Sequence, residues 1–178
     1  MVSNNALINK QLIKGVTLLE LMVTLSILII TLLLAAPSFA QWHEANKFKH
    51  ALRHITSLAE AAKLVAVSTQ SKVSFVVDVN SGQCAGSSRL TSCDCSVANA
   101  CSIDGKEYVF SATQSGISLL TANNKNRVVT FSKFGAVNFG NNTTINVNSP
   151  SHSGKVVISA LGRIKHCSTS NLSGVATC

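Results

Sequence analysis

One uninterrupted apolar run near the start of the chain constrains its fold more than any other feature. Residues 16–36 read VTLLELMVTLSILIITLLLAA and contain a single charged residue, Glu20. As a helix, this segment would be about 31 Å long, which matches a hydrocarbon core of about 30 Å. Buried helices of soluble domains are rarely so long and so uniformly apolar. The run therefore predicts a membrane-spanning helix.

A secretory signal peptide is the competing interpretation of this segment. Lys10 and Lys14 would supply its basic start, and small residues near Ser38 and Ala40 could form a cleavage site. However, the apolar run is longer than the apolar region of a signal peptide, and a signal peptide has no use for the carboxylate of Glu20. A membrane anchor fits both features better.

Glu20 is expected to have a function and a partner, because an ionisable residue in a membrane helix costs up to about 3 kcal/mol. No Lys or Arg lies between residues 16 and 42. The positive partner must therefore come from elsewhere, and the free amino terminus of another chain would serve. A buried charge of this kind becomes tolerable only when it is paired in an assembly.

Residues 14–20 (KGVTLLE) closely resemble the prepilin peptidase site of type IV pilins and type II secretion pseudopilins. The resemblance implies cleavage by prepilin peptidase between Gly15 and Val16, followed by methylation of the new amino terminus at Val16. It also implies that Glu20 meets the positive terminus of a neighbouring subunit during assembly. Pro37 falls where this class often carries a proline, whereas Val16 replaces the usual phenylalanine.

Beyond Pro37 the helix is expected to continue, although the proline removes one backbone hydrogen bond and should kink or locally melt it. Apolar residues recur at steps of three and four and predict one amphipathic stripe. They are Trp42, Ala45, Phe48, Leu52, Ile55, Ala59, Ala62 and Val65. The expected segments are a leader (1–15), a membrane and polymerisation helix (16–36), an amphipathic continuation (37–71) and a globular head (72–178).

From Lys72 the apolar period changes to two, which indicates strands bounded by Gly, Asn and Ser turns. Strands are expected around Val73–Val77 and at Tyr108–Ala112, Ile117–Thr121, Arg127–Ser132, Thr143–Asn148 and Lys155–Leu161, with a Cys- and Ser-rich loop at Gly86–Gly105. The predicted fold class is α+β, type IV pilin-like: a long N-terminal helix packed on a mostly antiparallel β-sheet head.

Six cysteines in a membrane-anchored chain indicate disulfides and an oxidising compartment. Cys167 and Cys178 are expected to close a loop at the C-terminus. The other four allow Cys84–Cys93 with Cys95–Cys101, or Cys84–Cys95 with Cys93–Cys101, because a Cys93–Cys95 bridge would be strained. Four thiolates could instead bind zinc, but the usual spacing of zinc ligands is absent, so no metal and no cofactor are expected.

Charge is distributed unevenly along the head. No Asp or Glu occurs from Tyr108 to Cys178, whereas six cations do: Lys125, Arg127, Lys133, Lys155, Arg163 and Lys165. Such a surface has a positive potential, and the phosphate backbone of DNA is a natural ligand for it. A merely basic surface without a polyanion ligand is the alternative.

The C-terminal half also resembles the FimT/FimU and GspH family of minor pilins and pseudopilins, at residues 128–135 (VVTFSKFG) and 155–165 (KVVISALGRIK). In FimT-type minor pilins, a Gly-Arg-x-Arg motif is implicated in DNA capture for natural transformation. Gly162, Arg163 and Lys165 match that motif with a lysine in place of the second arginine. Arg163 and Lys165 are expected to face outward together at the end of the last strand, with Ile164 pointing inward.

Phe131, Phe134 and Phe139 are expected in the core, so no aromatic would stand among the cations. Binding is then expected to be sequence-independent and to double-stranded DNA, through its phosphate backbone, rather than to single strands by stacking. The motifs of serine hydrolases, zinc proteases and phosphate-binding loops are absent, so an enzyme is not expected.

The sequence thus predicts a minor type IV pilin that is inserted in the bacterial inner membrane with its head in the periplasm and then built into a pilus with other major and minor pilins. A minor pseudopilin of a type II secretion system shares the leader and the fold and is the first alternative. A purely structural priming subunit without a DNA ligand is the second.

Overall fold

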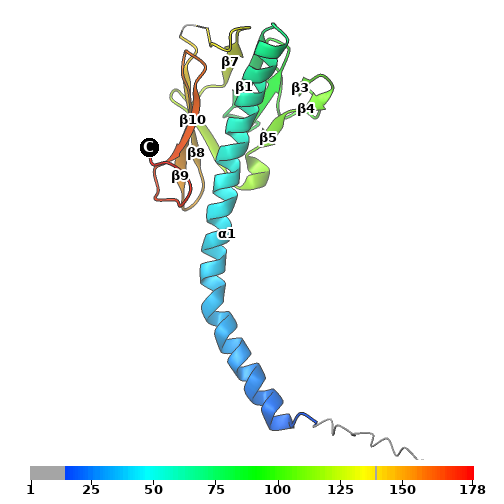
Figure 1. The fold of residues 1–178 in the computed structure, drawn as a ribbon, viewed down its shortest axis with the longest axis vertical. Helices are drawn as coiled ribbons and strands as arrows, with labels where there is room; N and C mark the ends of the chain where they lie inside the picture. The colour runs from blue at the N-terminus through cyan, green and yellow to red at the C-terminus, as the bar shows by residue number, and fades with distance from the viewer. Residues whose placement is uncertain (1–14, 139) are drawn as a thin grey trace, which may run out of the picture. The chain divides into compact units, whose positions relative to one another are not determined.

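The computed structural model describes residues 15–138 and 140–178, and the predicted leader residues 1–14 lie outside that range. The chain divides into two compact units, Met1–Gln41 and Trp42–Cys178. One helix, α1 (Leu18–Ser68), begins in the first unit and ends in the second, and the strands follow it (Figure 1). This order confirms the predicted α+β class with a long N-terminal helix.

The first unit contains the N-terminal part of α1, whose apolar side chains are exposed. This part is long and apolar enough to span a membrane, and none of its most apolar window is buried. The hydroxyls of Thr24, Ser26 and Thr31 donate to carbonyl oxygens three or four residues earlier, over 2.8–3.0 Å. Because these polar groups are satisfied within the helix, they need no water in an apolar environment. The helix continues through Pro37 and does not melt there.

In the second unit, α1 contributes one side of the core. The predicted stripe is fully buried at five positions, and Ala45 and Val65 are partly buried. Trp42 differs from the prediction, because 60% of it is exposed. Ala51, Leu58 and Ala66 widen the buried face, as expected for a helix that packs on two sheets. The five fully buried stripe residues are Phe48, Leu52, Ile55, Ala59 and Ala62.

The first sheet has the order β5-β2-β1-β7 and is antiparallel throughout. Its inner face packs on α1, where the Ser87 hydroxyl donates to the Leu58 carbonyl oxygen over 3.1 Å. Its outer face is covered by the Cys-rich segment 86–105, called the disulfide loop below because it carries Cys93, Cys95 and Cys101. β1 is therefore buried along almost its whole length. The strands are β1 (Val73–Asp78), β2 (Cys84–Ser88), β5 (Val109–Ser111) and β7 (Arg127–Phe131).

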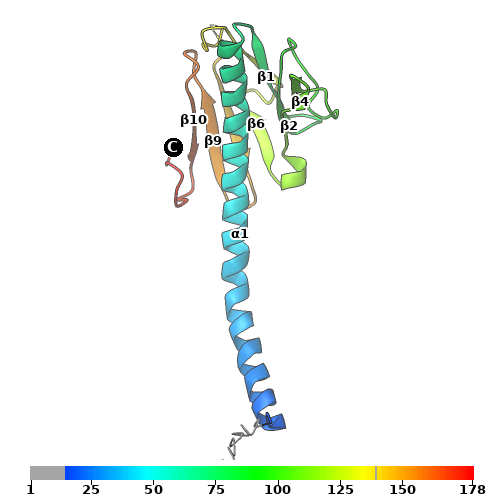
Figure 2. The ribbon, with the colours of Figure 1, turned by 45° about the vertical axis from the view of Figure 1, so that its right-hand side comes forward.

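The second sheet has the order β10-β9-β8-β6 and is also antiparallel (Figure 2). Gly154 allows a close approach to α1, since a Cβ at that position would lie 3.2 Å from Leu52 Cδ1 and 3.3 Å from Phe48 Cζ. Thr56 Oγ1 is also hydrogen-bonded to His166 Nδ1 over 3.2 Å. The strands are β6 (Ser118–Thr121), β8 (Thr143–Asn148), β9 (Ser153–Ile158) and β10 (Ile164–Ser168).

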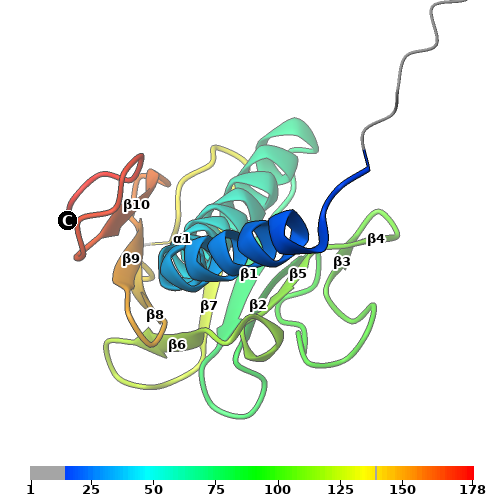
Figure 3. The ribbon, with the colours of Figure 1, turned by 90° about the horizontal axis from the view of Figure 1, so that it is seen from below.

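A small hairpin and one helical turn complete the second unit. The hairpin pairs β3 (Ser102–Ile103) with β4 (Lys106–Glu107), and the turn, η1, covers Thr113–Ser115. Seen from below, β3 and β4 lie on one flank of this unit and β9 and β10 on the other (Figure 3). The disulfide loop and the β9–β10 hairpin, which carries Lys155 and Lys165, therefore lie on different flanks.

Four strands were not among those predicted from the sequence, and two of them, β3 and β4, are the two-residue strands of the small hairpin. β2 and β10 were not expected as separate strands, because β2 (CAGSS) is rich in small residues and β10 (IKHCS) in polar ones. The predicted strand Lys155–Leu161 ends at Ile158, and Leu161 lies in a turn with 86% of its surface exposed. The positive φ of 71° at Gly162 belongs to this turn, which reverses the chain into β10.

Candidate functional site

The predicted cleavage position is open in the structure. Gly15 and Val16 precede α1, and both are exposed. Apart from its chain neighbours, no atom of the described residues lies within 4 Å of the place where a Cβ on Gly15 would stand. Packing therefore gives no reason for glycine at this position.

Glu20 lies in the first turn of α1. Its backbone N–H donates to Thr17 Oγ1 over 3.2 Å. A threonine followed three residues later by a glutamate has the spacing of a capping box, of which this bond is one half, and the helix dipole also favours an acid here. The Thr-x-x-Glu spacing was visible in the sequence, so this local role could have been found.

The carboxylate of Glu20 has no cationic partner in the described part of the chain. The ion pair between Arg89 and Asp104 is the only one within residues 15–138 and 140–178. Within the described residues Glu20 therefore has no counter-charge, and its pairing with the amino terminus of another chain stays a prediction.

Two of the predicted DNA-binding residues are neighbours on the solvent face of the second sheet. Lys165 on β10 lies opposite Val157, and Lys155 on β9 lies opposite Cys167. Lys155 and Lys165 are thus diagonal neighbours on the same face of the antiparallel pair, and such residues lie about 7–8 Å apart. Lys165 is exposed and Lys155 is half-buried, so both ammonium groups can reach an anionic ligand.

Arg163 is not on a strand, which corrects the expected arrangement. It closes the turn between β9 and β10, where its N–H donates to Ser159 Oγ over 3.0 Å and its carbonyl oxygen accepts the Ser159 N–H over 3.0 Å. Ile164 is partly buried against the core, as predicted, while Arg163 and Lys165 are exposed on either side of it.

The remaining cations do not form one cluster with this hairpin. Lys133 lies in the turn after β7, which contacts the β9–β10 turn through a hydrogen bond from the Val137 N–H to the Ala160 carbonyl oxygen, over 2.9 Å. Lys125 and Arg127 lie at the opposite end of β7, in the first sheet. Lys133 is therefore on a turn that contacts the turn carrying Arg163, whereas Lys125 and Arg127 lie near the other end of β7.

Gly162 has a structural role of its own. Its φ is +71°, and a Cβ at this position would stand 1.8 Å from the Gly135 carbonyl oxygen. Lys63 Nζ donates to the Gly162 carbonyl oxygen over 2.8 Å. The glycine of the Gly-Arg-x-Lys segment is thus required where two turns cross next to α1.

Phe134 was expected in the core, and that expectation is wrong. It is 81% exposed, and Lys133 Nζ lies 5.2 Å from its ring centroid. Phe131 is fully buried, as predicted, whereas Phe139 lies outside the described residues. An aromatic ring therefore does stand beside a cation on this surface.

All six cysteines form disulfides. Cys167 pairs with Cys178 as predicted. Of the two alternatives for the others, the structure has Cys84–Cys95 and Cys93–Cys101. Zinc binding by thiolates would require these bonds to be reduced.

Gly86 makes room for the two crossed bridges. A Cβ on this residue would stand 2.9 Å from Cys101 Sγ and 3.2 Å from Cys95 Cβ. The loop is thereby fastened to the outer face of β2, which accounts for the order in a segment expected to be only a loop.

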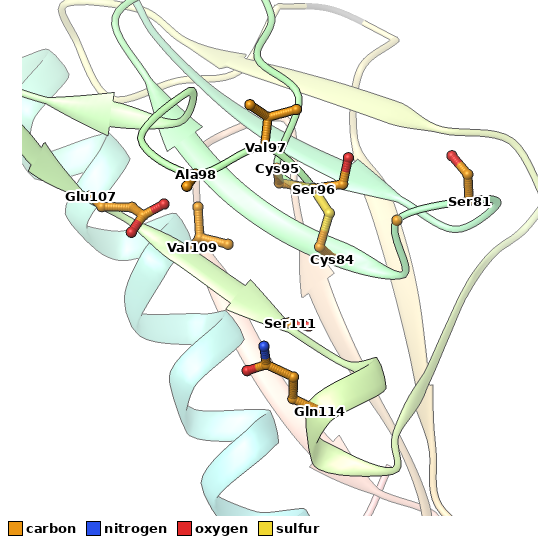
Figure 4. Close-up of a pocket in the computed structure, with 11 residues that line it drawn as sticks. Ser81, Cys84, Cys95, Ser96, Val97, Ala98, Glu107, Val109, Ser111 and Gln114 are labelled. Atoms are coloured by element: carbon orange, nitrogen blue, oxygen red, sulfur yellow. A yellow bond between two sulfur atoms is a disulfide. The ribbon is translucent and has the colours of Figure 1, made fainter.

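A polar pocket of about 430 Å³ lies beside the Cys84–Cys95 bridge (Figure 4). Its lining includes one carboxylate, Glu107, and the hydroxyls of Ser81, Ser96 and Ser111. Glu107 Oε1 accepts the Asn99 N–H over 2.8 Å. The described lining contains no histidine and no lysine beside these hydroxyls.

Arg89 fastens the disulfide loop to the end of α1. Its guanidinium donates to both carboxylate oxygens of Asp104 over 2.9 Å and to the hydroxyls of Thr69 and Ser71. The hydrogen bond from Arg89 lowers the pKa of Asp104 and raises the pKa of Arg89. Hydrogen bonds from Ser96 likewise lower the pKa of Asp94.

No model of a protein family matches the chain, and no curated protein matches it significantly. Among solved structures, it is similar to the type IV minor pilin FimU of Pseudomonas aeruginosa strain PAO1, with a TM-score of 0.53 and 16% identity over 75% of this chain and 98% of that chain. A second crystal form of FimU gives a TM-score of 0.49 over 71% of this chain and 98% of that chain.

This likeness identifies the class of structure. The protein has a type IV pilin-like fold, in which a long N-terminal helix packs on antiparallel sheets.

Proposed function

We propose that this protein is a minor subunit of a type IV pilus, anchored in the bacterial inner membrane before assembly. The observation that carries the proposal is the pilin-like fold whose helix begins with an exposed apolar segment. Exposed apolar surface of this extent needs either lipid or the helices of neighbouring subunits to cover it. A subunit that moves from membrane to filament meets both conditions in turn.

Processing at the N-terminus follows from this proposal. Prepilin peptidase cleaves between Gly15 and Val16, and Val16 is then methylated. Support comes from the exposed position of both residues ahead of α1 and from a glycine that packing does not require. The new amino terminus of one subunit neutralises Glu20 of the next, because a carboxylate in apolar surroundings needs a counter-charge.

The three disulfides support a head that folds in the periplasm, since disulfides persist in oxidising compartments. A minor pseudopilin of a type II secretion system would share this compartment and this fold. Detection of the protein in sheared surface pili would favour the pilus assignment, whereas its restriction to the cell envelope would favour the secretion system.

Glu20→Gln in the full chain tests the assembly role. The amide keeps the size of the side chain and removes its charge, so membrane insertion is expected to be retained and the amount of protein in sheared pili to fall at least tenfold. Glu107→Gln, the same change at an exposed glutamate on β4, is the matched control. Unchanged pilus levels of Glu20→Gln would contradict the proposed charge pairing.

DNA binding is a second candidate function, and it is favoured by the positions of Lys155 and Lys165 on one solvent face with Arg163 at its edge. Phosphate neutralisation by these groups carries no base specificity. A structural priming subunit without a DNA ligand is the alternative. Gel shifts with duplex DNA at several salt concentrations distinguish the two.

The expected result is a fall of log K with log salt of about 0.9 per phosphate contacted, so replacing Arg163 and Lys165 by Ala should reduce the slope by about 2. Lys106→Ala, on the other flank of the head, should leave the slope unchanged. Binding that is unaltered in the double variant would leave the DNA hypothesis without its site.

A further inference from the structure

Exposed apolar side chains gather around the C-terminal end of α1. Leu64 is 69% exposed, Val67 38%, Phe134 81% and Leu161 86%. They come from the helix and from the two turns that cross next to it. Contiguous apolar surface with a polar rim is typical of an interaction site, whereas single exposed apolar residues are common on any protein.

A groove of about 620 Å³ lies at this place, between α1 and the turn that leads into β10. Leu64, Val67 and Ile164 provide its apolar lining, and Lys63 and Arg163 provide cations. Glu60 is the only acidic residue that lines it. The groove therefore has an apolar interior and a mostly positive rim.

The walls of this groove are held together before any partner arrives. Lys63 Nζ donates to the Gly162 carbonyl oxygen over 2.8 Å, so the helix is tied to the β9–β10 turn. A Cβ on Gly135 would stand 3.2 Å from Val67 Cγ2, so the turn after β7 packs directly on the helix. A preformed groove loses little conformational entropy on binding.

Charge indicates what the groove binds. The guanidinium of Arg163 has no ion-pair partner within the described part of the chain, and Lys63 uses one of its three donors on Gly162. An apolar side chain with a carboxylate beside it would fill the groove and pair with Arg163. A second copy is a poor candidate, because the chain keeps a formal charge of +6 after removal of the leader lysines Lys10 and Lys14 (+8 minus 2), and two copies repel one another.

We propose that this groove is the docking site for a neighbouring filament subunit of different sequence, which inserts an apolar side chain flanked by an acidic residue. The proposal rests on the proposed pilin function and assigns a surface to head-to-head contact in the filament. The apolar groove walls offer no donor to a phosphate backbone, so the proposed DNA site is the neighbouring solvent face with Lys155 and Lys165, and Arg163 lies where the two surfaces meet.

Leu64→Asp in the full chain tests the apolar part of the site. Leu64 is exposed, so the variant should fold and insert as the wild type does, while its amount in sheared pili relative to the membrane fraction should fall at least tenfold. Leu90→Asp is the matched control, because Leu90 is 65% exposed on the other flank, and it should assemble normally.

Charge reversal tests the other part. Arg163→Glu should lower the amount in pili several-fold, and Arg163→Lys should restore most of it. Wild-type levels for both Leu64→Asp and Arg163→Glu would overturn the docking site while leaving the pilin function intact. Absence of the wild-type protein from pili would overturn both. Loss of duplex DNA binding by Arg163→Glu, with normal assembly, would assign Arg163 to DNA instead.

Self-association identifies the occupant. The purified full chain in detergent micelles is expected to stay monomeric at neutral pH. If it forms dimers that Leu64→Asp abolishes, the groove binds a second copy, and the proposed partner of different sequence is wrong.

Discussion

The two parts of α1 have the same backbone conformation and opposite surroundings. Between Leu18 and Gln41 the apolar side chains are exposed, whereas from Trp42 to Ser68 most of them are buried under the protein's own sheets. The first part carries one charge, and the second carries cations and acids off its buried stripe. The comparison shows that helix formation alone does not decide the role of a segment. Its apolar pattern decides what must cover it.

Truncation of an apolar side chain should show the largest difference in effect between the two parts of α1. Phe48→Ala removes a fully buried ring and is expected to lower the free energy of unfolding of the head by about 3–5 kcal/mol. Leu28→Ala, in the exposed part, should change it by less than about 0.5 kcal/mol. Proteolysis of the full chain in detergent across a urea series measures both. Equal losses would break the comparison.

A charge in the first part should have the converse effect. Leu28→Lys places an ammonium group near the middle of the predicted span and is expected to disfavour insertion by about 3 kcal/mol, while the urea midpoint of the head stays unchanged. Alkaline extraction of membranes measures the insertion. The control is Arg53→Glu, a change of charge at an exposed residue on the head part of α1, and this variant should insert normally.

The cap at the start of α1 should contribute less. Thr17→Ala removes the acceptor for the Glu20 N–H, and the expected loss is about 1 kcal/mol, confined to the first helical turn. Hydrogen exchange of the first amides in micelles measures it, and Thr17→Ser is expected to restore protection. Protection that is unaffected by Thr17→Ala would show that the surroundings, not the cap, fix the helix start.

Loss of the ion pair between Arg89 and Asp104, near the C-terminal end of α1, should have the smallest effect. Arg89→Gln removes the hydrogen bonds to exposed Asp104, so a slight loss of stability is expected at neutral pH. Because the folded state lowers the pKa of Asp104, this contribution is present above the ordinary pKa of an aspartate and is lost as the pH falls through the folded value. The difference between the unfolding curves of wild type and variant should therefore shrink in acid, to what the hydrogen bonds from Arg89 to Thr69 and Ser71 contribute. A difference of the same size at neutral and acid pH would contradict the role of Asp104.

Regular patterns in the sequence predicted much of the fold. The stripe from Phe48 to Ala62 and the alternation in β8 follow directly from periods of 3.6 and 2. β2 and β10 were missed because small and polar residues carry little apolar pattern, and pairing partners far along the chain hold these strands in place. Trp42 follows the stripe but is exposed, since the period does not show where the sheet ends.

The candidate site was less accessible to sequence reasoning. Lys155 and Lys165 are neighbours because of the register in which β9 pairs with β10. This register depends on the turn at Gly162, which the sequence pattern did not predict. For the four clustered cysteines, the sequence left two possible pairings. The structure has Cys84–Cys95 and Cys93–Cys101, because β2 lies directly beneath Cys95 and Cys101. The groove beside Leu64 brings residues about 100 positions apart together, so no local pattern indicates it.

The central claim is that the first part of α1 is the processed anchor of a filament subunit. Intact mass spectrometry of the protein extracted from membranes tests it most directly. The account predicts a chain that begins at Val16 and carries one additional methyl group. A chain that still begins at Met1, or that has lost the whole apolar segment by cleavage near Ala40, would contradict it.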